Sequence, residues 1–342
     1  MLGKISRPSN RFDLRQVGTD RQSGQFAEDV RIGLTADSKF LPPMYFYDEL
    51  GSRLFEAICL LPEYYLTRAE SEILEANVDE IVSLAAGNDD LECRLIELGS
   101  GSGEKTRYLI EGFLDRQAEL HYIPIDISAE SLEQSANQLS ADYPRVKVTA
   151  YSGDYFSVLD NLRQSGLPGA DNSRNVFLFL GSNIGNLDSK QARVFLREIR
   201  RLLSPNDALL LGADLKKDPD TLISAYDDSL GVTAAFNRNL LARINRELRA
   251  DFDVCMFEHL AIYNDELSRV EMHLVSREPQ TVTIRGINLT VTFDWRESIH
   301  TESSHKFDID AIAELASDTG FLVRKSWFDR ERQFSFNLLV AQ

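Results

Sequence analysis

A glycine-rich turn and two acids, each following a short apolar run, are the residues whose spacing most directly suggests chemistry. The turn Glu97-Leu98-Gly99-Ser100-Gly101-Ser102-Gly103 follows a predicted strand and opens a predicted helix. Glycines there let the backbone turn sharply and approach a ligand without a Cβ in the way. Asp126 ends the next apolar run, where it could accept hydrogen bonds from ribose hydroxyls. Asp154 follows a third run and could hold an adenine amino group, with Tyr155 packed beside the base.

The glycine-rich turn and the two acids indicate a cofactor site only in combination, because each of them alone is a weak indication. A glycine-rich turn occurs in many nucleotide-binding folds, and a single acid such as Asp126 is often a loop residue or a helix cap. Both acids at the ends of successive strands favour a cofactor that carries ribose and adenine. The turn does not match the Walker pattern, which argues against a nucleoside triphosphate.

The elements that must position these residues are predicted by alternating apolar runs and amphipathic stretches. Between the apolar runs, helical spacing such as that in Glu104–Gln117 predicts connecting helices. Strand, helix and strand repeated in this way indicate a parallel sheet with right-handed crossovers. The predicted strands are Leu95–Leu98, Tyr122–Ile127, Val146–Tyr151, Val176–Leu180 and Ala208–Leu211.

The end of the chain predicts a helix followed by a hairpin of two strands. Ile309–Ser317 has helical spacing, and Phe321–Phe328 and Phe334–Val340 are strand-like segments joined by a short charged turn. Five parallel strands that end in this way resemble the class I methyltransferase fold, a Rossmann-like α/β sheet. A nicotinamide-binding Rossmann sheet does not usually end with such a hairpin.

Residues 216–305 are not needed by this fold and predict a second, α+β part. They contain a long helical stretch and four strand-like segments: Thr221–Leu248, then Met256–Tyr263, Val270–Ser276, Gln280–Ile284 and Leu289–Phe293. We expect a substrate-recognition domain of residues 1–68 and 216–305, covering the carboxyl edge of a cofactor-binding domain of residues 69–215 and 306–342. Part of the polar stretch Ser6–Gln25 is expected to be loosely held.

Composition and charge limit the class of substrate. The 342 residues are 43% hydrophobic and 27% charged, with a formal net charge of −17. Nucleic-acid-binding proteins usually present a basic face, so we expect a small-molecule substrate and no nucleic acid. We also expect no membrane span and no secretory signal. The three cysteines and five histidines lack metal-ligand spacing, so we expect a cytoplasmic monomer without a metal.

Longer segments resemble the histidine Nα-methyltransferases of ergothioneine biosynthesis. The resemblance runs from about residue 40 to the C-terminus. It implies an S-adenosylmethionine-dependent enzyme that methylates the α-amino group of histidine, up to the trimethyl betaine hercynine. The matching segments are Tyr45–Phe55, Leu61–Arg68, Glu97–Thr106, Gly181–Leu187, Ala225–Asp228, Gly231–Asn239, Val270–Met272 and Thr301–Phe307.

The resemblance also implies roles for individual residues. Asn186 and Tyr226 fall where the family holds the substrate carboxylate, and Tyr47 falls beside the amine. Tyr64 falls beside the side-chain pocket, Glu302 and Ser304 fall where the family binds the imidazole, and Gly181 and Met272 complete the expected substrate site. Two positions depart from the family, since Tyr155 replaces a more usual Phe and Asn183 a commoner Thr. Residues expected around S-adenosylmethionine are Gly99, Lys105, Asp126, Asp154 and Tyr155.

The chemistry of Glu302 and Ser304 agrees with an imidazole ligand. The two residues are two apart, so both face one side if the segment is extended. Imidazole has two nitrogens, and a carboxylate and a hydroxyl can satisfy one each. A buried polar group left unpaired costs about 1–3 kcal/mol, so this pair favours histidine over tryptophan, whose indole has one N–H.

Other functions remain open from the sequence. Without the family context, Glu302 and Ser304 would usually be an exposed acid and a turn hydroxyl. A relative that methylates another aromatic amino acid such as tryptophan is the nearest alternative. A nicotinamide-dependent oxidoreductase would share the glycine turn and Asp126, but the terminal hairpin counts against it. An idle S-adenosylmethionine sensor would not need the substrate residues.

Overall fold

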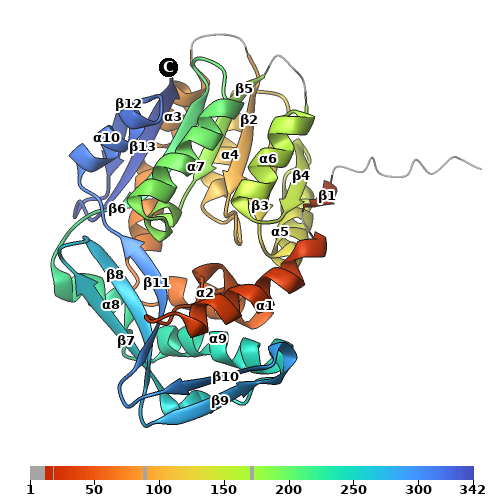
Figure 1. Ribbon diagram of the computed structural model, residues 1–342. Coiled ribbons are helices and arrows are strands. Elements are labelled where there is room, and N and C mark those ends of the chain that lie inside the picture. Colours follow the sequence, from red (N-terminus) through yellow and green to blue (C-terminus); the bar gives the residue numbers. More distant parts are fainter. Residues whose placement is uncertain (1–11, 18, 88–90, 170–172) are drawn as a thin grey trace, which may run out of the picture.

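An eight-stranded sheet forms the centre of the protein in this computed structural model, which describes residues 12–17, 19–87, 91–169 and 173–342 (Figure 1). The strand order is β1-β4-β3-β2-β5-β6-β13-β12. β1 to β6 run parallel, and β13 lies antiparallel between β6 and β12. The strands are β1 (Phe12–Gln16), β2 (Cys93–Leu98), β3 (Leu120–Asp126), β4 (Val146–Ser152), β5 (Arg174–Phe179), β6 (Ala208–Asp214), β12 (Phe321–Phe328) and β13 (Phe334–Ala341).

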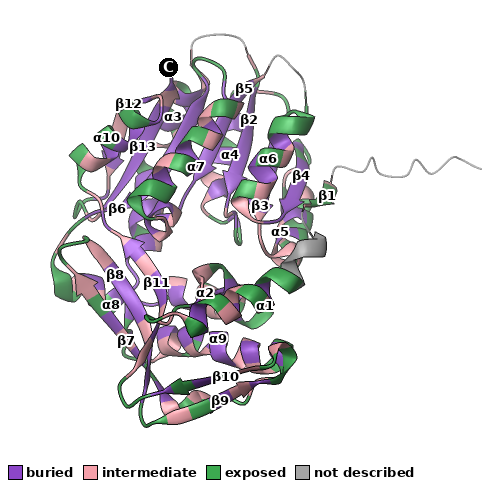
Figure 2. Cartoon of the chain, viewed as in Figure 1, coloured by how far each residue is buried: buried purple, intermediate pink, exposed green. Residues whose placement is uncertain are grey.

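Helices cover both faces of this sheet, so its central strands are buried throughout (Figure 2). In β2, Leu95 belongs to one core cluster, while Ile96 and Leu98 belong to the cluster on the opposite face. This two-sided burial explains why the central strands are continuous apolar runs. The helices are α3 (Leu66–Ala86), α4 (Thr106–Leu114) and α5 (Ala129–Asp142) on the first face, and α6 (Tyr155–Ser165), α7 (Ser189–Leu202) and α10 (Ile309–Asp318) on the second.

Two smaller sheets lie beyond the carboxyl ends of the parallel strands (Figure 1). Three antiparallel strands have the order β11-β8-β7, and β9 pairs with β10 as a hairpin. The strands are β7 (Phe257–Asn264), β8 (Arg269–Ser276), β9 (Gln280–Ile284), β10 (Leu289–Phe293) and β11 (Ser298–His305). The helices around them are α1 (Thr19–Thr35), α2 (Glu49–Cys59), α8 (Pro219–Tyr226) and α9 (Val232–Leu248), with short 3₁₀ turns η1 (Pro43–Phe46), η3 (Val254–Met256) and η4 (Arg285–Ile287).

The chain leaves and re-enters the main sheet at one point. Leu215 and Phe307 form a parallel bridge. The Phe307 amide donates to the Asp214 carbonyl, at 2.9 Å, and the Lys216 amide donates to the Phe307 carbonyl, at 2.8 Å. Residues 216–305 therefore begin and end side by side, at the carboxyl end of β6.

The five predicted parallel strands, the terminal helix and the hairpin are confirmed. The single long helix predicted for Thr221–Leu248 is wrong, because a turn around Gly231 separates α8 from α9. Gly231 has a φ of +74°, which a helix interior does not accommodate. In the polar stretch Ser6–Gln25, Phe12–Gln16 form β1 on the edge of the main sheet and α1 begins at Thr19; residues 6–11 lie outside the described part.

Candidate active site

A pocket lies where the carboxyl edge of the main sheet meets the smaller sheets. It contains about 490 Å³ of empty space, including its open mouth. All eight residues predicted for substrate binding line it, which brings together positions from six separate parts of the chain. The predicted lining residues are Tyr47, Tyr64, Gly181, Asn186, Tyr226, Met272, Glu302 and Ser304. Further lining residues, for which the sequence predicted no role in substrate binding, are Phe55, Ile58, Leu66, Ser182, Asn183, Ala225, Thr233 and Phe236.

A β-bulge in β11 directs Glu302 and Ser304 into the pocket. His300 pairs with His273 and Glu302 with Met272, so Thr301 is the extra residue. Before the bulge the odd-numbered residues are buried, and after it the even-numbered ones are. The Thr301 hydroxyl donates to the Met272 carbonyl at 3.0 Å, which holds the bulge. A bulge that re-aims side chains is common beside functional sites.

Glu302 is a buried acid that the protein itself leaves unsatisfied. Its residue surface is 9% exposed, and among the described residues its carboxylate accepts no hydrogen bond. Burial raises the pKa of Glu302 from 4.5 to about 7, and the charge of Lys306 lowers it only in part. A buried carboxylate without a donor is costly, so this side chain suits a ligand that brings an N–H.

Aromatic rings form one wall of the pocket. The Tyr47 ring contacts Phe55 and Phe236 edge to face, with centroids 5.6 Å and 5.8 Å apart. Tyr64 contacts Phe55 at 6.1 Å and Tyr226 at 6.3 Å. Burial raises the pKa of both Tyr47 and Tyr64 well above the ordinary value, so both phenols stay neutral. Within the described chain the Tyr47 hydroxyl makes no hydrogen bond and is free to meet a ligand.

Tyr47 is fixed by its neighbour Asp48. Asp48 caps α2 by accepting from the Gly51 amide at 2.8 Å. The same carboxylate accepts from Asn239 at 2.7 Å and from Arg246 at 2.6 Å, both on α9. The segment that carries Tyr47 is therefore tied to the helix that carries Phe236.

The loop after β5 forms the floor of the pocket. The Gly181 amide donates to both oxygens of Glu70, at 3.0 Å and 2.9 Å. The turn η2 (Asn183–Asn186) packs against β11 so closely that a Cβ on Gly185 would lie 2.8 Å from the His305 carbonyl oxygen. Only glycine fits there. These contacts fix the loop that carries Asn186.

The glycine-rich turn lies beside this floor. Gly101 and Ser128 donate their amides to Asp126, each at 3.0 Å, and burial raises the Asp126 pKa. Asp154 caps α6 by accepting from the Ser157 amide at 3.0 Å. A Cβ on Gly99, whose φ is +75°, would lie 2.5 Å from the Tyr155 hydroxyl and 2.8 Å from Nδ2 of the Asn183 side chain. Asn183 thus contacts the turn and also lines the substrate pocket.

The residues around the turn fit a bound S-adenosylmethionine. The Ser100 hydroxyl is buried and has no hydrogen-bond partner in the described chain, so it can serve a ligand. Space is open above Gly101 and Gly103, since a Cβ at either would meet no atom within 4 Å. Asp126 and Asp154 stand at the ends of β3 and β4, where ribose and adenine groups can reach acceptors. Lys105 forms an ion pair with Glu70 and lies next to Gly181, between the turn and the pocket.

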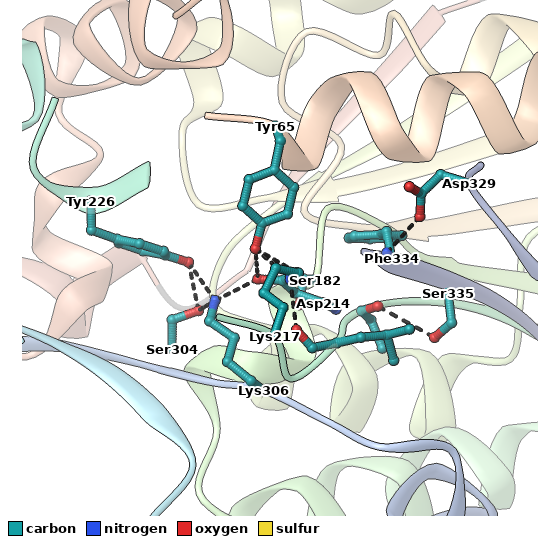
Figure 3. A network of polar contacts seen from close by, with 12 residues as sticks. Tyr65, Ser182, Asp214, Lys217, Tyr226, Ser304, Lys306, Asp329, Phe334 and Ser335 are labelled. Carbon is teal, nitrogen blue, oxygen red and sulfur yellow. Dashed lines mark hydrogen bonds and ion pairs between the residues drawn. The ribbon is translucent and has the colours of Figure 1, made fainter. Parts of the chain in front are cut away.

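A buried polar network beneath the pocket was not predicted (Figure 3). Lys306 is fully buried and forms an ion pair with Asp214 at 2.8 Å. Asp214 also accepts from Tyr65 at 2.9 Å and pairs with Lys217. Burial lowers the pKa of Lys306, but Asp214 and Tyr226 outweigh it and raise the pKa overall. For Lys217 burial prevails and lowers the pKa to about 8.

Two sequence signals could have revealed buried charges. Lys306 is two residues after Ser304, in the same alternating pattern as Glu302. Glu70 lies on the apolar face of α3, between Leu66 and Ile73 in helical spacing. In both cases a charged residue occupies a position that the pattern assigns to the interior.

Neither a metal-ion site nor a membrane-spanning helix is found in the part of the chain that the structure describes. Within residues 12–17, 19–87, 91–169 and 173–342, no group of three or more His, Cys, Asp or Glu side chains is arranged to hold a metal ion. Over the same ranges, no helix combines the length and the apolar character that crossing a bilayer requires.

Comparison with known proteins assigns this arrangement to a family. A family model described as histidine-specific methyltransferase, SAM-dependent, matches residues 26–341. The histidine N-alpha-methyltransferase of Mycolicibacterium smegmatis is 41% identical over 324 residues, covering 95% of this chain and 97% of that protein. The protein of the same name from Mycobacterium tuberculosis is 42% identical over 323 residues, covering 94% and 97%. Ergothioneine biosynthesis protein 1 of Schizosaccharomyces pombe is 33% identical over 252 residues, covering 72% of this chain and 32% of that longer protein.

Proposed function

The chain belongs to the family of histidine-specific, S-adenosylmethionine-dependent methyltransferases, and we propose that it methylates the α-amino group of L-histidine in the first step of ergothioneine biosynthesis. The observation that carries the proposal is the position of Glu302 and Ser304 on one side of a pocket that adjoins the glycine-rich turn through Asn183. The names of the two mycobacterial relatives support the same substrate, and the name of the Schizosaccharomyces pombe relative supports the same pathway.

Glu302 and Ser304 would bind the imidazole ring. The unsatisfied Glu302 carboxylate would accept a ring N–H, and Ser304 would bind the second nitrogen. Tyr64 and Met272 would enclose the apolar parts of the ring. An indole has one N–H and would leave one of these two polar groups unpaired, at a cost of about 1–3 kcal/mol.

The amino-acid backbone would lie on the floor of the pocket. Asn186 and Tyr226 would bind the carboxylate. The amine would then lie near Tyr47 and the Gly181 carbonyl, and both can accept hydrogen bonds from an N–H. Because the Tyr47 phenol stays neutral, it would orient the lone pair of the amine rather than remove its proton.

Transfer requires a neutral amine in line with the methyl group. S-adenosylmethionine supplies a methyl group that is already activated by the sulfonium charge. The protein would contribute alignment through Tyr47, Gly181 and Asn186, and the aromatic wall would exclude water. After each transfer, S-adenosylhomocysteine would leave and the methylated ammonium would release its proton to solvent, and we propose that transfer continues to the trimethyl betaine.

For the cofactor, Asp126 would bind the ribose hydroxyls and Asp154 the adenine amino group, beside Tyr155. Gly99 and Lys105 would lie along the methionine part. We propose that residues 69–215 and 306–342 form the cofactor-binding domain and residues 1–68 and 216–305 the substrate domain, although β1 of the latter pairs with β4 in the main sheet. We also propose that the protein acts as a cytoplasmic monomer.

Substrate choice is tested by titrating histidine and tryptophan into the protein with bound S-adenosylhomocysteine. Selective binding of histidine is expected, followed by mass-spectrometric detection of one, two and three added methyl groups in turnover. Preferential binding of tryptophan would leave the methyltransferase family intact but refute the proposed roles of Glu302 and Ser304. Binding of neither amino acid would refute the substrate altogether.

A further inference from the structure

Lys306 contacts two residues of the substrate pocket from below. Its ammonium nitrogen lies 2.9 Å from the Tyr226 hydroxyl, 2.9 Å from the Ser304 hydroxyl and 2.8 Å from the Asp214 carboxylate (Figure 3). A lysine ammonium has three N–H groups. All three are used within the protein, so Lys306 has no donor left for a ligand.

The two hydroxyls also contact each other. Tyr226 donates to the Ser304 oxygen at 2.7 Å, which closes a triangle with the ammonium nitrogen. Lys306 can only donate, so each of the two oxygens accepts one hydrogen bond from it. One hydroxyl proton lies between the two oxygens. Without a ligand, one hydroxyl proton therefore remains unused by this triangle. It belongs to Ser304 when Tyr226 donates, and to Tyr226 if the bond between the two hydroxyls reverses.

We infer that Lys306 is a positioning residue for substrate recognition, which holds the Tyr226 and Ser304 oxygens in place and leaves their protons to be donated to the bound amino acid. The inference rests on the proposed function, because it assumes that the ligand contacts both hydroxyls. When histidine binds, the hydrogen bond between Tyr226 and Ser304 would be exchanged for one bond to the carboxylate and one to the ring nitrogen, while Lys306 keeps both oxygens in place.

Asp214 explains how a fully buried cation is tolerated in this position. The carboxylate is itself fully buried, accepts from Tyr65 and pairs with both Lys306 and Lys217. A buried cation without a counter-charge would be strongly unfavourable. Lys217 contacts the same carboxylate, Tyr65 and the Leu215 carbonyl. It provides a matched control, because it shares the ion-pair partner of Lys306 and does not contact the two hydroxyls.

The test compares K306M with K217M by steady-state kinetics, with histidine varied. K306M is expected to raise the histidine KM about tenfold, while kcat falls less and the affinity for S-adenosylhomocysteine is unchanged. K217M is expected to leave the histidine KM unchanged. K306R, which keeps the charge, is expected to recover part of the loss. An unchanged histidine KM in folded K306M would overturn the inference.

A double-mutant cycle separates positioning from a general structural effect. If Lys306 acts through the two hydroxyls, K306M should have no further effect on the histidine KM in a Y226F/S304A background. Additive effects would refute the inference. If K306M does not fold, the double variant D214N/K306M, which removes both charges of the ion pair, replaces K306M in this comparison. Wild-type protein is the reference: failure to methylate histidine would refute the proposed function, whereas normal wild-type turnover with additive mutants refutes only the role of Lys306.

Discussion

Replacing Glu302 with Gln should weaken histidine binding and at the same time stabilise the unliganded protein at alkaline pH. The substitution keeps the size of the side chain and removes its charge. In the unliganded protein the Glu302 carboxylate is buried and accepts no hydrogen bond in the described chain. The buried carboxylate therefore destabilises the unliganded protein. Removing its charge should raise the free energy of unfolding and weaken histidine binding.

The stability effect follows from the pKa of Glu302. Burial raises this pKa from 4.5 to about 7, so the folded protein holds the proton more tightly than the unfolded chain does. Wild-type stability is then reduced progressively as the pH rises from 4.5 to about 7, and the reduction is complete above that pH. At about 1.4 kcal/mol per pH unit, the difference amounts to about 3 kcal/mol at pH 8. E302Q has no side-chain carboxyl group at this position, so its free energy of unfolding should not fall in this way as the pH rises.

The binding effect follows from the loss of a charged acceptor. Hydrogen bonds to charged groups contribute about 1.5–3 kcal/mol and neutral ones about 0.5–1.5 kcal/mol. The difference of about 1–1.5 kcal/mol corresponds to a roughly tenfold higher KM for histidine at pH 8. At pH 6, where wild-type Glu302 is mostly protonated, the ratio of the two KM values should be smaller.

Thermal unfolding at pH 5 and pH 8, together with histidine kinetics at pH 6 and pH 8, tests both effects. The unfolding temperature of E302Q should exceed that of the wild type at pH 8 and approach it at pH 5. A pH-independent difference would show that burial does not raise the Glu302 pKa. An unchanged histidine KM at pH 8 would refute the contact between Glu302 and the ring.

Three further substitutions test other parts of the site. Y47F should lower kcat about 100-fold, as expected when a reacting amine loses the contact that orients it, and change the histidine KM little; an unaltered kcat would show that Tyr47 does not orient the amine. G185A should lower the free energy of unfolding by about 1–3 kcal/mol in chemical denaturation, because its Cβ would meet the His305 carbonyl; unchanged stability would mean that the loop has room to shift. D126N should weaken S-adenosylhomocysteine binding about 10- to 100-fold in calorimetry, as expected for the loss of a charged hydrogen-bond acceptor; equal affinity would place the ribose elsewhere.

The parallel sheet could be predicted because each central strand is buried on both faces. That burial requires an apolar run, and Val176–Leu180 and Ala208–Leu211 show it without interruption. The turn between α8 and α9 was missed because helical spacing continues on both sides of it. The break is marked by Gly231 and by Asp228, whose carboxylate accepts from the Val232 and Thr233 amides, but neither residue type by itself ends a helix.

Eight residues that line the pocket could be named from the sequence, but their arrangement in space could not. Spacing alone places Glu302 and Ser304 on one side of a strand, but the bulge at Thr301 decides that this side faces the pocket. Strand register depends on pairing with β8, which periodicity does not reveal. The contact between Lys306 and Asp214 joins segments distant in the chain, so local patterns give no sign of it.

Because residues 216–305 begin and end side by side, this segment could be exchanged as a unit between the enzyme and its relatives. Since Leu215 and Phe307 lie side by side, recombination could replace the whole intervening segment while the main sheet keeps its connections. Such a chimera would take Tyr226, Met272 and Glu302 from one parent, but Tyr47 would come from the other. The lining of the pocket is therefore encoded in separate stretches of the gene, and a hybrid that receives only the segment 216–305 would combine two parts of a pocket that were never selected together.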